Sequence, residues 1–179
     1  FGASKVTKLS PNGAITFWQY EEGYFAPISV VTDTDDGCVI YWTDPWNQQY
    51  LIKLSADGTP GFRYDVPLEY RGTGGLAIDN DGDYLLATGG DSYSGGAGAL
   101  LKFDRDSGSY TVIHEFEVGS CPTAVQVDSE GNYFVIGHWD NRLVKITPTG
   151  DMTTLYQFEP GTYPARFTMD REGNFIVPE

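Results

Sequence analysis

A short turn that begins with Asp and ends with Gly occurs four times in this chain of 179 residues. Each copy separates two apolar segments rich in β-branched and aromatic residues. Asp and Asn are favoured in such turns because their side chains bond to the turn backbone, and Gly adopts the positive φ angle that follows. The four copies, which predict four β-hairpins of one design, are Asp35–Gly37, Asp79–Gly82, Asp128–Gly131 and Asp170–Gly173.

A second element repeats in step with these turns. It is an apolar strand with a central Lys, followed by another Gly turn and by a strand rich in aromatic residues. The Lys strands are Val6–Leu9, Leu51–Leu54, Leu100–Phe103 and Leu143–Ile146. The aromatic strands are Ile15–Tyr20, Phe62–Val66, Tyr110–Phe116 and Met152–Phe158. Each unit therefore has four antiparallel strands, as in one blade of a β-propeller.

The spacing of the turns predicts how the units close. Counting from Gly173 past Glu179 to Phe1 and on to Gly13 gives the same 19 residues that separate Gly131 from Gly150. We therefore expect one all-β domain over residues 1–179, in which the last blade takes strands from both termini. The expected blades are approximately 28–74, 75–123, 124–165, and 166–179 together with 1–27. The alternative is that four blades form half of an eight-bladed ring.

The repeats resemble those of the NHL and virginiamycin-B-lyase-like propeller families. The resemblance rests on the Asp-x-(Asp/Glu)-Gly turn and the Lys-centred third strand, and it extends over essentially the whole chain. Tyr41–Asp44 also resembles the YWTD signature of low-density-lipoprotein-receptor propellers, although it occurs once here. The resemblance to the lyases implies a His acting as base, for which His138 is the candidate. Related lactonases hold a metal at the pore with Glu, Asn and Asp, whereas Pro27, Thr73, Pro122 and Pro164 stand at the corresponding positions here.

The charge of the chain limits its partners. The net charge is −14 and the calculated pI is about 4.3, so nucleic acid and anionic membrane surfaces are disfavoured. No apolar run approaches the ~18 residues of a membrane span. Many aromatic residues, few Lys and only two Cys favour an extracellular or secreted protein, and the first residue, Phe1, indicates that a leader or a longer precursor has been removed.

Blade topology sorts the loops onto two faces. The face with the Asp–Gly turns carries more than half of the 25 acidic residues. The preference of such turns for Asp explains why acidic residues are concentrated there. Calcium is the one cofactor that these carboxylates would allow, although no single turn supplies the six or more oxygen ligands that calcium takes. The opposite face carries loop aromatics and a few bases, which predict a surface for binding protein or glycan. The expected binding residues are Trp46, Tyr93, Trp139, Tyr163 and Arg71.

His138 lies in a loop of this second face and is the only residue we consider for catalysis. With Asp44, Asp91 and Asp140 in related loops, it could also contribute to a metal site. Cys121 is expected on the same face, but a Cys121–His138 nucleophile pair would lack an orienting third group. No catalytic residue is therefore assigned beyond His138 as a candidate.

The two cysteines are expected at opposite ends of their blades. A strand of about six residues spans ~20 Å, and a disulfide needs Cα atoms within ~7 Å of each other. An internal bridge between Cys38 and Cys121 is therefore excluded by the predicted fold. A bridge between molecules and two unpaired thiols both remain open.

The sequence as a whole favours a non-enzymatic extracellular propeller that binds a partner or assembles with itself. An aromatic, partly basic face and an acidic face on one molecule are complementary, so molecules could stack head-to-tail into filaments. The alternative is a small metal-dependent lyase or lactonase of the virginiamycin-B-lyase or gluconolactonase-like type. Fold alone decides neither, because propellers host many functions.

Overall fold

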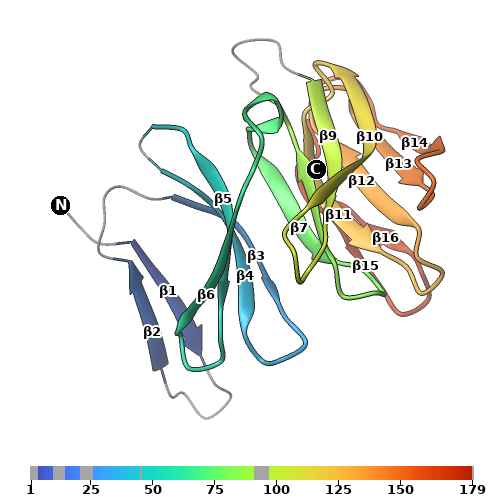
Figure 1. Ribbon diagram of the computed structural model, residues 1–179. Coiled ribbons are helices and arrows are strands. Elements are labelled where there is room, and N and C mark those ends of the chain that lie inside the picture. The colour runs from blue at the N-terminus through green and yellow to red at the C-terminus, as the bar shows by residue number, and fades with distance from the viewer. Residues whose placement is uncertain (1–3, 10–14, 21–25, 45, 91–96, 179) are drawn as a thin grey trace. The chain divides into compact units, whose positions relative to one another are not determined.

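The computed structural model describes residues 4–9, 15–20, 26–44, 46–90 and 97–178 (Figure 1). The chain divides into two compact units, residues 1–66 and 67–179. The described residues form antiparallel β-sheets joined by tight turns, with one short 3₁₀ helix at Leu68–Tyr70. No helix among these residues is long and apolar enough to cross a membrane.

The first unit contains a hairpin and a four-stranded sheet. The hairpin pairs β1 (Ser4–Leu9) with β2 (Ile15–Tyr20). The sheet has its strands in chain order: β3 (Ala26–Thr32), β4 (Cys38–Thr43), β5 (Gln49–Leu54) and β6 (Pro60–Asp65). We call this sheet blade 1. Its buried strands β4 and β5 form a core against which Val6 of β1 packs.

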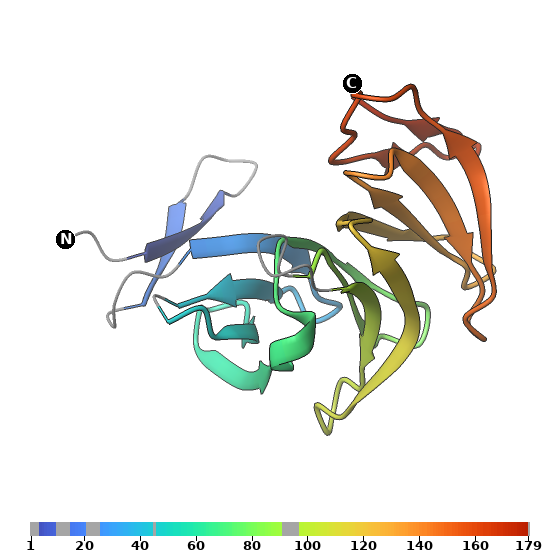
Figure 2. The same cartoon turned by 90° about the horizontal axis from the view of Figure 1, so that it is seen from above.

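The second unit contains two four-stranded sheets and a final hairpin (Figure 2). Blade 2 is β7 (Gly74–Ile78), β8 (Tyr84–Thr88), β9 (Ala97–Phe103) and β10 (Tyr110–Val118). Blade 3 is β11 (Pro122–Val127), β12 (Tyr133–Gly137), β13 (Arg142–Ile146) and β14 (Met152–Gln157). The hairpin pairs β15 (Thr168–Met169) with β16 (Phe175–Ile176).

Burial follows the position of each strand within its blade. The second strands β4, β8 and β12 are buried along almost their whole length, which explains why they are continuous runs of Val, Ile, Leu and aromatic residues. The last strands β6 and β14 are largely exposed. The strand pattern predicted from the sequence is confirmed in each complete blade.

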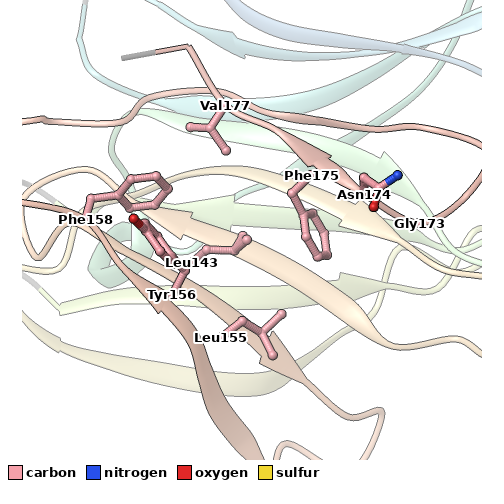
Figure 3. Close-up of a pocket in the computed structure, with 8 residues that line it drawn as sticks. All are labelled: Leu143, Leu155, Tyr156, Phe158, Gly173, Asn174, Phe175 and Val177. Atoms are coloured by element: carbon pink, nitrogen blue, oxygen red, sulfur yellow. The ribbon is translucent and has the colours of Figure 1, made fainter.

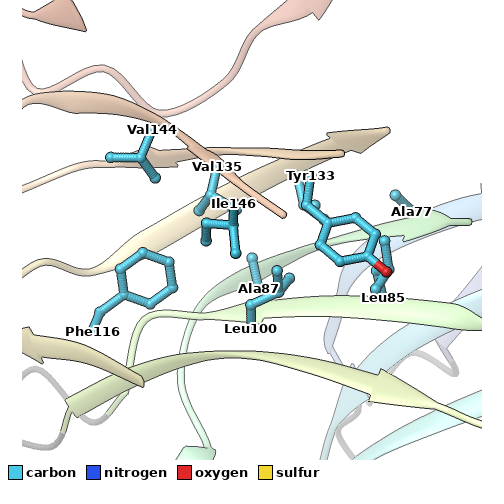
Figure 4. Close-up of a cluster of buried hydrophobic side chains, with 10 residues drawn as sticks. Ala77, Leu85, Ala87, Leu100, Phe116, Tyr133, Val135, Val144 and Ile146 are labelled. Carbon is cyan, nitrogen blue, oxygen red and sulfur yellow. The ribbon is translucent and has the colours of Figure 1, made fainter. Parts of the chain in front are cut away.

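The core of the second unit lies between blades 2 and 3 (Figure 4). Leu85, Leu100 and Phe116 of blade 2 pack against Val135 and Ile146 of blade 3. The opposite face of blade 3 packs against the β15–β16 hairpin through a second cluster, which contains Phe134, Ile136, Leu143, Phe158 and Phe167. Adjacent blades therefore bury both faces of blade 3.

The first strands of blades 2 and 3 approach each other closely. A Cβ atom added to Gly75 would lie 2.7 Å from the Cα of Ala124, closer than real side chains come. The absence of a side chain at Gly75 therefore allows β7 to lie against β11. Glycine is otherwise unfavourable within a strand, so this close approach explains its presence here.

The first turn differs from the expected repeat by one residue. Asp33 N–H bonds to Gly37 O as Asp79 N–H bonds to Asp83 O, so Gly37 corresponds to Asp83. The position of positive φ, which Gly82 occupies in blade 2, is filled by Asp36 with φ of 64°. Our alignment of Gly37 with the turn glycines was wrong, because Asp also adopts this backbone conformation.

The strands predicted to form the fourth blade lie in two separate hairpins, one in each unit. β1–β2 and β15–β16 each form a two-stranded sheet, while blades 1 to 3 have four strands each. The closing of this blade by both termini, and the single-domain boundaries that depend on it, stay predictions.

Candidate functional site

Three aromatic rings lie in mutual contact at one end of blade 3. The ring of His138 is 5.0 Å from that of Trp139 and 5.5 Å from that of Tyr163, and the rings of Trp139 and Tyr163 are 5.3 Å apart. Trp139 and Tyr163 expose 51% and 47% of their surface. We call these three residues the aromatic cluster. Such a half-exposed group offers apolar faces together with polar edges.

Asn141 holds the aromatic cluster together. Its Nδ2 donates to the Trp139 carbonyl at 3.1 Å, and its Oδ1 accepts from the Tyr163 N–H at 2.8 Å. The carbonyl of Asn141 accepts from Gln157 Nε2 at 3.0 Å and from Phe158 N–H at 2.8 Å. Asn141 is itself buried. The loop that carries Trp139 and the segment that carries Tyr163 are therefore fixed to one side chain.

The backbone around the cluster adopts an uncommon conformation. Asn141, Tyr163 and Cys121 have φ angles of 54°, 51° and 50°. For non-glycine residues this left-handed region costs energy, and such positions concentrate at binding and catalytic sites, where surrounding contacts enforce them.

His138 has one ring nitrogen engaged with the backbone. Its Nδ1 lies 3.3 Å from the carbonyl of Pro164, and because a carbonyl oxygen only accepts, this contact assigns a proton to Nδ1. In that tautomer Nε2 carries a lone pair, and the structure describes no hydrogen bond to Nε2 from the residues it covers. His138 N–H also bonds to the Cys121 carbonyl at 3.0 Å. The ring is thus oriented by both the backbone and the cluster.

Asp140 is committed to Arg142. Its Oδ2 accepts from Arg142 Nε at 3.0 Å and from Arg142 Nη2 at 2.7 Å. Its Oδ1 is buried against Gly137 and has no hydrogen-bond partner among the described residues. A Cβ atom at position 137 would overlap this carboxylate, which would then have to shift. Asp140 therefore neutralises Arg142 beside the aromatic cluster.

Asp44 is also satisfied locally. It accepts from the N–H groups of Trp46 and Gln48 and from the Tyr50 hydroxyl, at 2.9, 2.7 and 2.7 Å. Burial would raise the pKa of Asp44, but these hydrogen bonds outweigh it and lower the pKa. Across the described residues, no three His, Cys, Asp or Glu side chains are grouped as metal ligands. Of the four metal-site candidates, His138 and Asp140 are near one another in sequence, and Asp91 lies outside the described residues.

The predicted binding residues have different environments. Trp139 and Tyr163 belong to the aromatic cluster, and Trp46, in the first unit, is 78% exposed. Arg71 is buried, with 9% exposed, so its guanidinium offers little surface to a partner. Tyr93 lies outside the described residues. Of the predicted binding residues, the structure therefore brings together Trp139 and Tyr163.

Both cysteines are buried free thiols. The Cys121 Sγ lies 3.7 Å from Thr73 Oγ1, and its link to His138 is through the backbone alone. Burial raises the pKa of the Cys38 thiol, which lowers its reactivity. A bridge between molecules would require both thiols to be uncovered first.

The acidic turns use their carboxylates within each blade. Lys53 Nζ lies 2.9 Å from Asp33 and 2.6 Å from Asp35. Lys102 Nζ lies 2.6, 3.4 and 3.0 Å from Asp79, Asp81 and Asp83. In blades 1 and 2 the central Lys of the third strand therefore pairs with the first turn of its own blade. Calcium binding by these turns stays a prediction.

A scan against protein-family models gives no match, and a search of curated proteins gives none either. Solved structures do resemble the chain. One is a catalytically inactive variant of virginiamycin B lyase from Staphylococcus aureus with quinupristin, at a TM-score of 0.76 and 16% identity over 97% of this chain and 55% of that chain. Another is a streptogramin B lyase, with a TM-score of 0.75 and 18% sequence identity. The match covers 98% of this chain and 55% of that chain. A third is a gluconolactonase from Xanthomonas campestris, with a TM-score of 0.71 and 13% sequence identity. The match covers 96% of this chain and 60% of that chain.

The chain has the β-propeller fold. The resemblance to virginiamycin-B-lyase-like propellers is confirmed at the level of the fold, and the chain spans little more than half the length of these structures. At 13–18% identity the likeness carries no activity by itself. The YWTD-like segment has a structural role here, because Tyr41 and Trp42 are buried and Asp44 organises the following turn.

Sequence reasoning singled out the rings of the cluster but missed Asn141. The available signal was its place directly after Asp140 in a short loop, where Asn favours positive φ. Its contact with Tyr163 joins residues 22 positions apart, and no local pattern predicts that contact.

Proposed function

We propose that this chain acts on a ring-containing small molecule by a lyase-type reaction at the aromatic cluster, with His138 as the base. The observation that carries the proposal is the ring of His138, whose Nδ1 is engaged by the Pro164 carbonyl while its side lies against two half-exposed aromatic rings. An imidazole whose Nδ1 is held by a backbone carbonyl presents Nε2 as the free basic nitrogen, which suits proton abstraction. The likeness in fold to two lyases supports the same reaction class.

The chemistry needs few groups. Trp139 and Tyr163 would hold an apolar ring of the substrate by stacking and by excluding water. The Nε2 of His138 would take a proton from a carbon beside an electron-withdrawing group. The electrons of that C–H bond form a double bond as the bond to the leaving group breaks, and the leaving group departs with those electrons. No water is consumed.

A metal-dependent lactonase is less well supported by these residues. Asp140 is tied to Arg142, and Asp44 is saturated by its own turn. The positions entering the first strands hold Pro27, Thr73, Pro122 and Pro164, whose side chains provide no carboxylate. Among the residues that the structure describes, these side chains therefore do not form a donor set for a metal ion, and the proposed base mechanism uses His138.

The test is turnover of a panel of cyclic esters that includes quinupristin and gluconolactone, followed by mass spectrometry. A lyase gives a ring-opened product of unchanged mass, whereas a lactonase adds the mass of one water. We expect His138→Gln to lower kcat by about 10²–10⁴-fold, the range for a general base, with binding retained. Trp139→Ala should instead weaken binding, measured by calorimetry.

His114→Gln is the matched control. His114 Nδ1 also bonds to a backbone carbonyl, that of Gly150 at 3.1 Å, but at a different part of the unit. It should leave turnover unchanged. Hydrolysed products, equal turnover in His138→Gln, or binding of every tested ester without conversion would refute the proposal.

A non-enzymatic binding and assembly module, acting outside the cell, is the second candidate. Its specific support is Trp46, a large apolar side chain that is 78% exposed, together with the acidic turns. Head-to-tail filaments would bury such aromatics against acidic faces. A chain that converts none of the esters but grows in size with concentration at low salt would support this candidate, and a particle that stays at 19.7 kDa would exclude filaments.

A further inference from the structure

A pocket lies between blades 2 and 3, on the side of the acidic turns. The turns before β8, β12 and β14 contribute to its walls, together with β9, β10 and the start of β12. Its volume of about 290 Å³ is at the lower limit of ligand pockets, which span ~300–1,000 Å³. The lining combines charged, hydroxyl and apolar side chains, among them Asp81, Lys102, Ile113, Glu130, Tyr133 and Pro148. The pocket therefore suits a small ligand with one polar end.

Two contacts between the blades fix the walls of this pocket. Asn80 Nδ2 donates to the Asp128 carbonyl at 3.1 Å, which joins the first turns of blades 2 and 3. His114 Nδ1 lies 3.1 Å from the Gly150 carbonyl, which joins β10 to the turn before β14. A Cβ atom at Gly150 would lie 2.5 Å from the Ile113 carbonyl, so glycine permits this approach. The pocket is therefore formed in advance by the packing of two blades.

Tyr133 directs a buried hydroxyl toward the pocket. The residue exposes 3% of its surface and lines the pocket at the start of β12. In Figure 4 its hydroxyl lies at the edge of the core cluster, on the side of Ala77 and Leu85, whose strands flank the first turn of blade 2. This hydroxyl forms no hydrogen bond with the residues that the structure describes. A buried hydroxyl without a partner costs about 1–3 kcal/mol, which a polar group in the pocket would recover.

The next repeat shows that packing does not require this hydroxyl. Phe175 stands two residues after Gly173, as Tyr133 stands two residues after Gly131. Phe175 lines a larger groove, of about 660 Å³, beside Phe158 (Figure 3). The lining of that groove contains no charged side chain. A charged lining and a tyrosine at this repeat position therefore distinguish the pocket between blades 2 and 3.

The charges of the pocket favour a cation. Asp79, Asp81 and Glu130 line it, whereas Lys102 is the one basic residue in its lining. The ammonium group of Lys102 is already shared among Asp79, Asp81 and Asp83, at 2.6, 3.4 and 3.0 Å. An ammonium group has three donors, so these contacts occupy all of them. An anion would therefore meet an excess of carboxylates, and a cation would be attracted.

The apolar walls and the tyrosine favour an organic cation. Ile113 and Pro148 offer apolar surface, which suits an alkyl chain. Burial raises the pKa of the Tyr133 hydroxyl, so the group stays protonated at neutral pH and its oxygen can accept from an N–H donor. The described His, Cys, Asp and Glu side chains form no group of three for a metal ion.

We propose that this pocket binds a small aliphatic primary amine. The ammonium group of the amine donates to Asp81, Glu130 and the Tyr133 hydroxyl, and its alkyl chain lies along Ile113 and Pro148. Three donors thus meet two carboxylates and one hydroxyl oxygen, and hydrogen bonds between charged partners are the stronger kind.

The amine site is separate from the aromatic cluster. Tyr133 begins β12 and Gly137, which precedes His138, ends it. The pocket and the cluster therefore lie at opposite ends of this strand and share no residue. Amine binding and turnover of a cyclic ester can be measured independently, so failure of one proposal leaves the other unaffected.

A titration followed by methyl NMR tests the proposal. The probe is n-butylamine, and n-butanol and calcium chloride are titrated separately, because a chain of net charge −14 attracts any cation. We expect n-butylamine to shift the Ile113 methyl signals saturably and to leave those of Ile176, in β16, unchanged. Neither n-butanol nor calcium should reproduce the shift. Absence of a saturable shift, or displacement of the amine by calcium, would overturn the proposal.

Substitutions assign the binding to the named groups. Tyr133→Phe and Glu130→Gln should each raise the dissociation constant of n-butylamine about tenfold, the effect of one hydrogen bond to a charged group. Glu172→Gln is the matched control, because Glu172 stands one residue before Gly173 as Glu130 stands one residue before Gly131, and it should leave the dissociation constant unchanged.

Tyr133→Phe should also leave the melting temperature unchanged or raise it, since the substitution removes a buried hydroxyl without a described partner. A lower melting temperature would show that the hydroxyl is bonded within the fold and would contradict the proposal. Unchanged amine binding in Tyr133→Phe, or an equal loss in Glu172→Gln, would also refute it.

Discussion

The Oδ1 of Asn141 accepts a 2.8 Å hydrogen bond from the backbone N–H of Tyr163, and this bond ties the segment between β14 and β15 to the end of blade 3. The same side chain donates to the Trp139 carbonyl. A single buried amide therefore sets the spacing of the two exposed rings in the aromatic cluster. Substitution of Asn141 can separate what its side chain contributes to the stability of the fold from what it contributes to ligand binding.

Asn141→Gly should weaken ligand binding more than it weakens the fold. Glycine tolerates the φ of 54°, so the substitution removes the side-chain bonds without adding backbone strain. We expect a loss of about 1–3 kcal/mol in the free energy of unfolding, the cost of hydrogen bonds whose buried partners are left unpaired. Tyr163 and Trp139 should also become more mobile, seen as a change in tryptophan fluorescence. Asn47→Gly, at a φ of 59° in blade 1, should leave the fluorescence of Trp139 unchanged.

Asp36→Gly should stabilise the protein. Asp36 occupies the positive-φ position of the first turn, where the other three turns have glycine. Relief of this strain should outweigh the greater flexibility of glycine in the unfolded chain. We expect a net gain of about 0.5–1 kcal/mol in the free energy of unfolding, measured by urea denaturation. Gly37→Ala, one residue later, should destabilise, because its Cβ would overlap the Leu54 carbonyl. Equal effects of the two substitutions would contradict our assignment of the turn.

Lys102→Met should cost about 2–3 kcal/mol of stability at neutral pH. Lys102 is surrounded by Asp79, Asp81 and Asp83, and removing its charge leaves the nearly buried Asp79 unpaired. Burial alone would lower the pKa of Lys102, but hydrogen bonds to Asp79 and Asp83 raise it above the usual value. A raised pKa means that the stabilisation is complete below the unfolded value of about 10.4 and is lost as the pH rises through the folded value.

The difference in stability between Lys102→Met and the wild type should therefore be constant from pH 6 to about 10 and narrow only above that. Lys145→Met is the comparison, since Lys145 lies 6.0 Å from the Phe134 ring centroid and makes no described ion pair. We expect a smaller loss there. A difference that already disappears near pH 8 would show that Lys102 does not act through its charge.

Acid should unfold the protein through its turn carboxylates. The Ser55 hydroxyl and the Thr59 N–H lower the pKa of Asp57 to about 2. Bonds from Asn174 lower the pKa of Asp170, and bonds from Asn132 lower that of Asp128 although burial opposes them. Carboxylates with lowered pKa contribute stability above the unfolded value of about 3.9 and lose it as the pH falls through the folded value.

The free energy of unfolding, from denaturant titrations at several pH values, should thus decline from about pH 4 toward pH 2. Asp128→Asn should flatten part of that decline while lowering stability at pH 7. An unchanged slope in this variant would mean that its turn does not contribute to the acid transition.

Local chemistry explains which features were predictable from the sequence. The Asp–Gly turns and the Lys strands depend on residues close in the chain, and three of the four blades that they predicted are present as four-stranded sheets. Asp36 misled the alignment because Asp and Gly both tolerate positive φ. The burial of Arg71 and the groove beside Phe158 arise from packing between segments distant in sequence, which a single sequence does not encode in any local pattern. The aromatic cluster was predicted in part, because loop aromatics are visible in the sequence, whereas the amide that joins them is not.

The pairing of Lys53 and Lys102 with the first turns of their own blades gives blades 1 and 2 each a chemical reporter of folding. The ammonium groups of Lys53 and Lys102 are held among carboxylates while the first and third strands remain together, so an amine-acylating reagent should reach them only when that blade opens. Mass spectrometry of peptides labelled at increasing denaturant would then reveal which of these two blades opens first. Two near-copies in one chain would thereby report their unfolding separately.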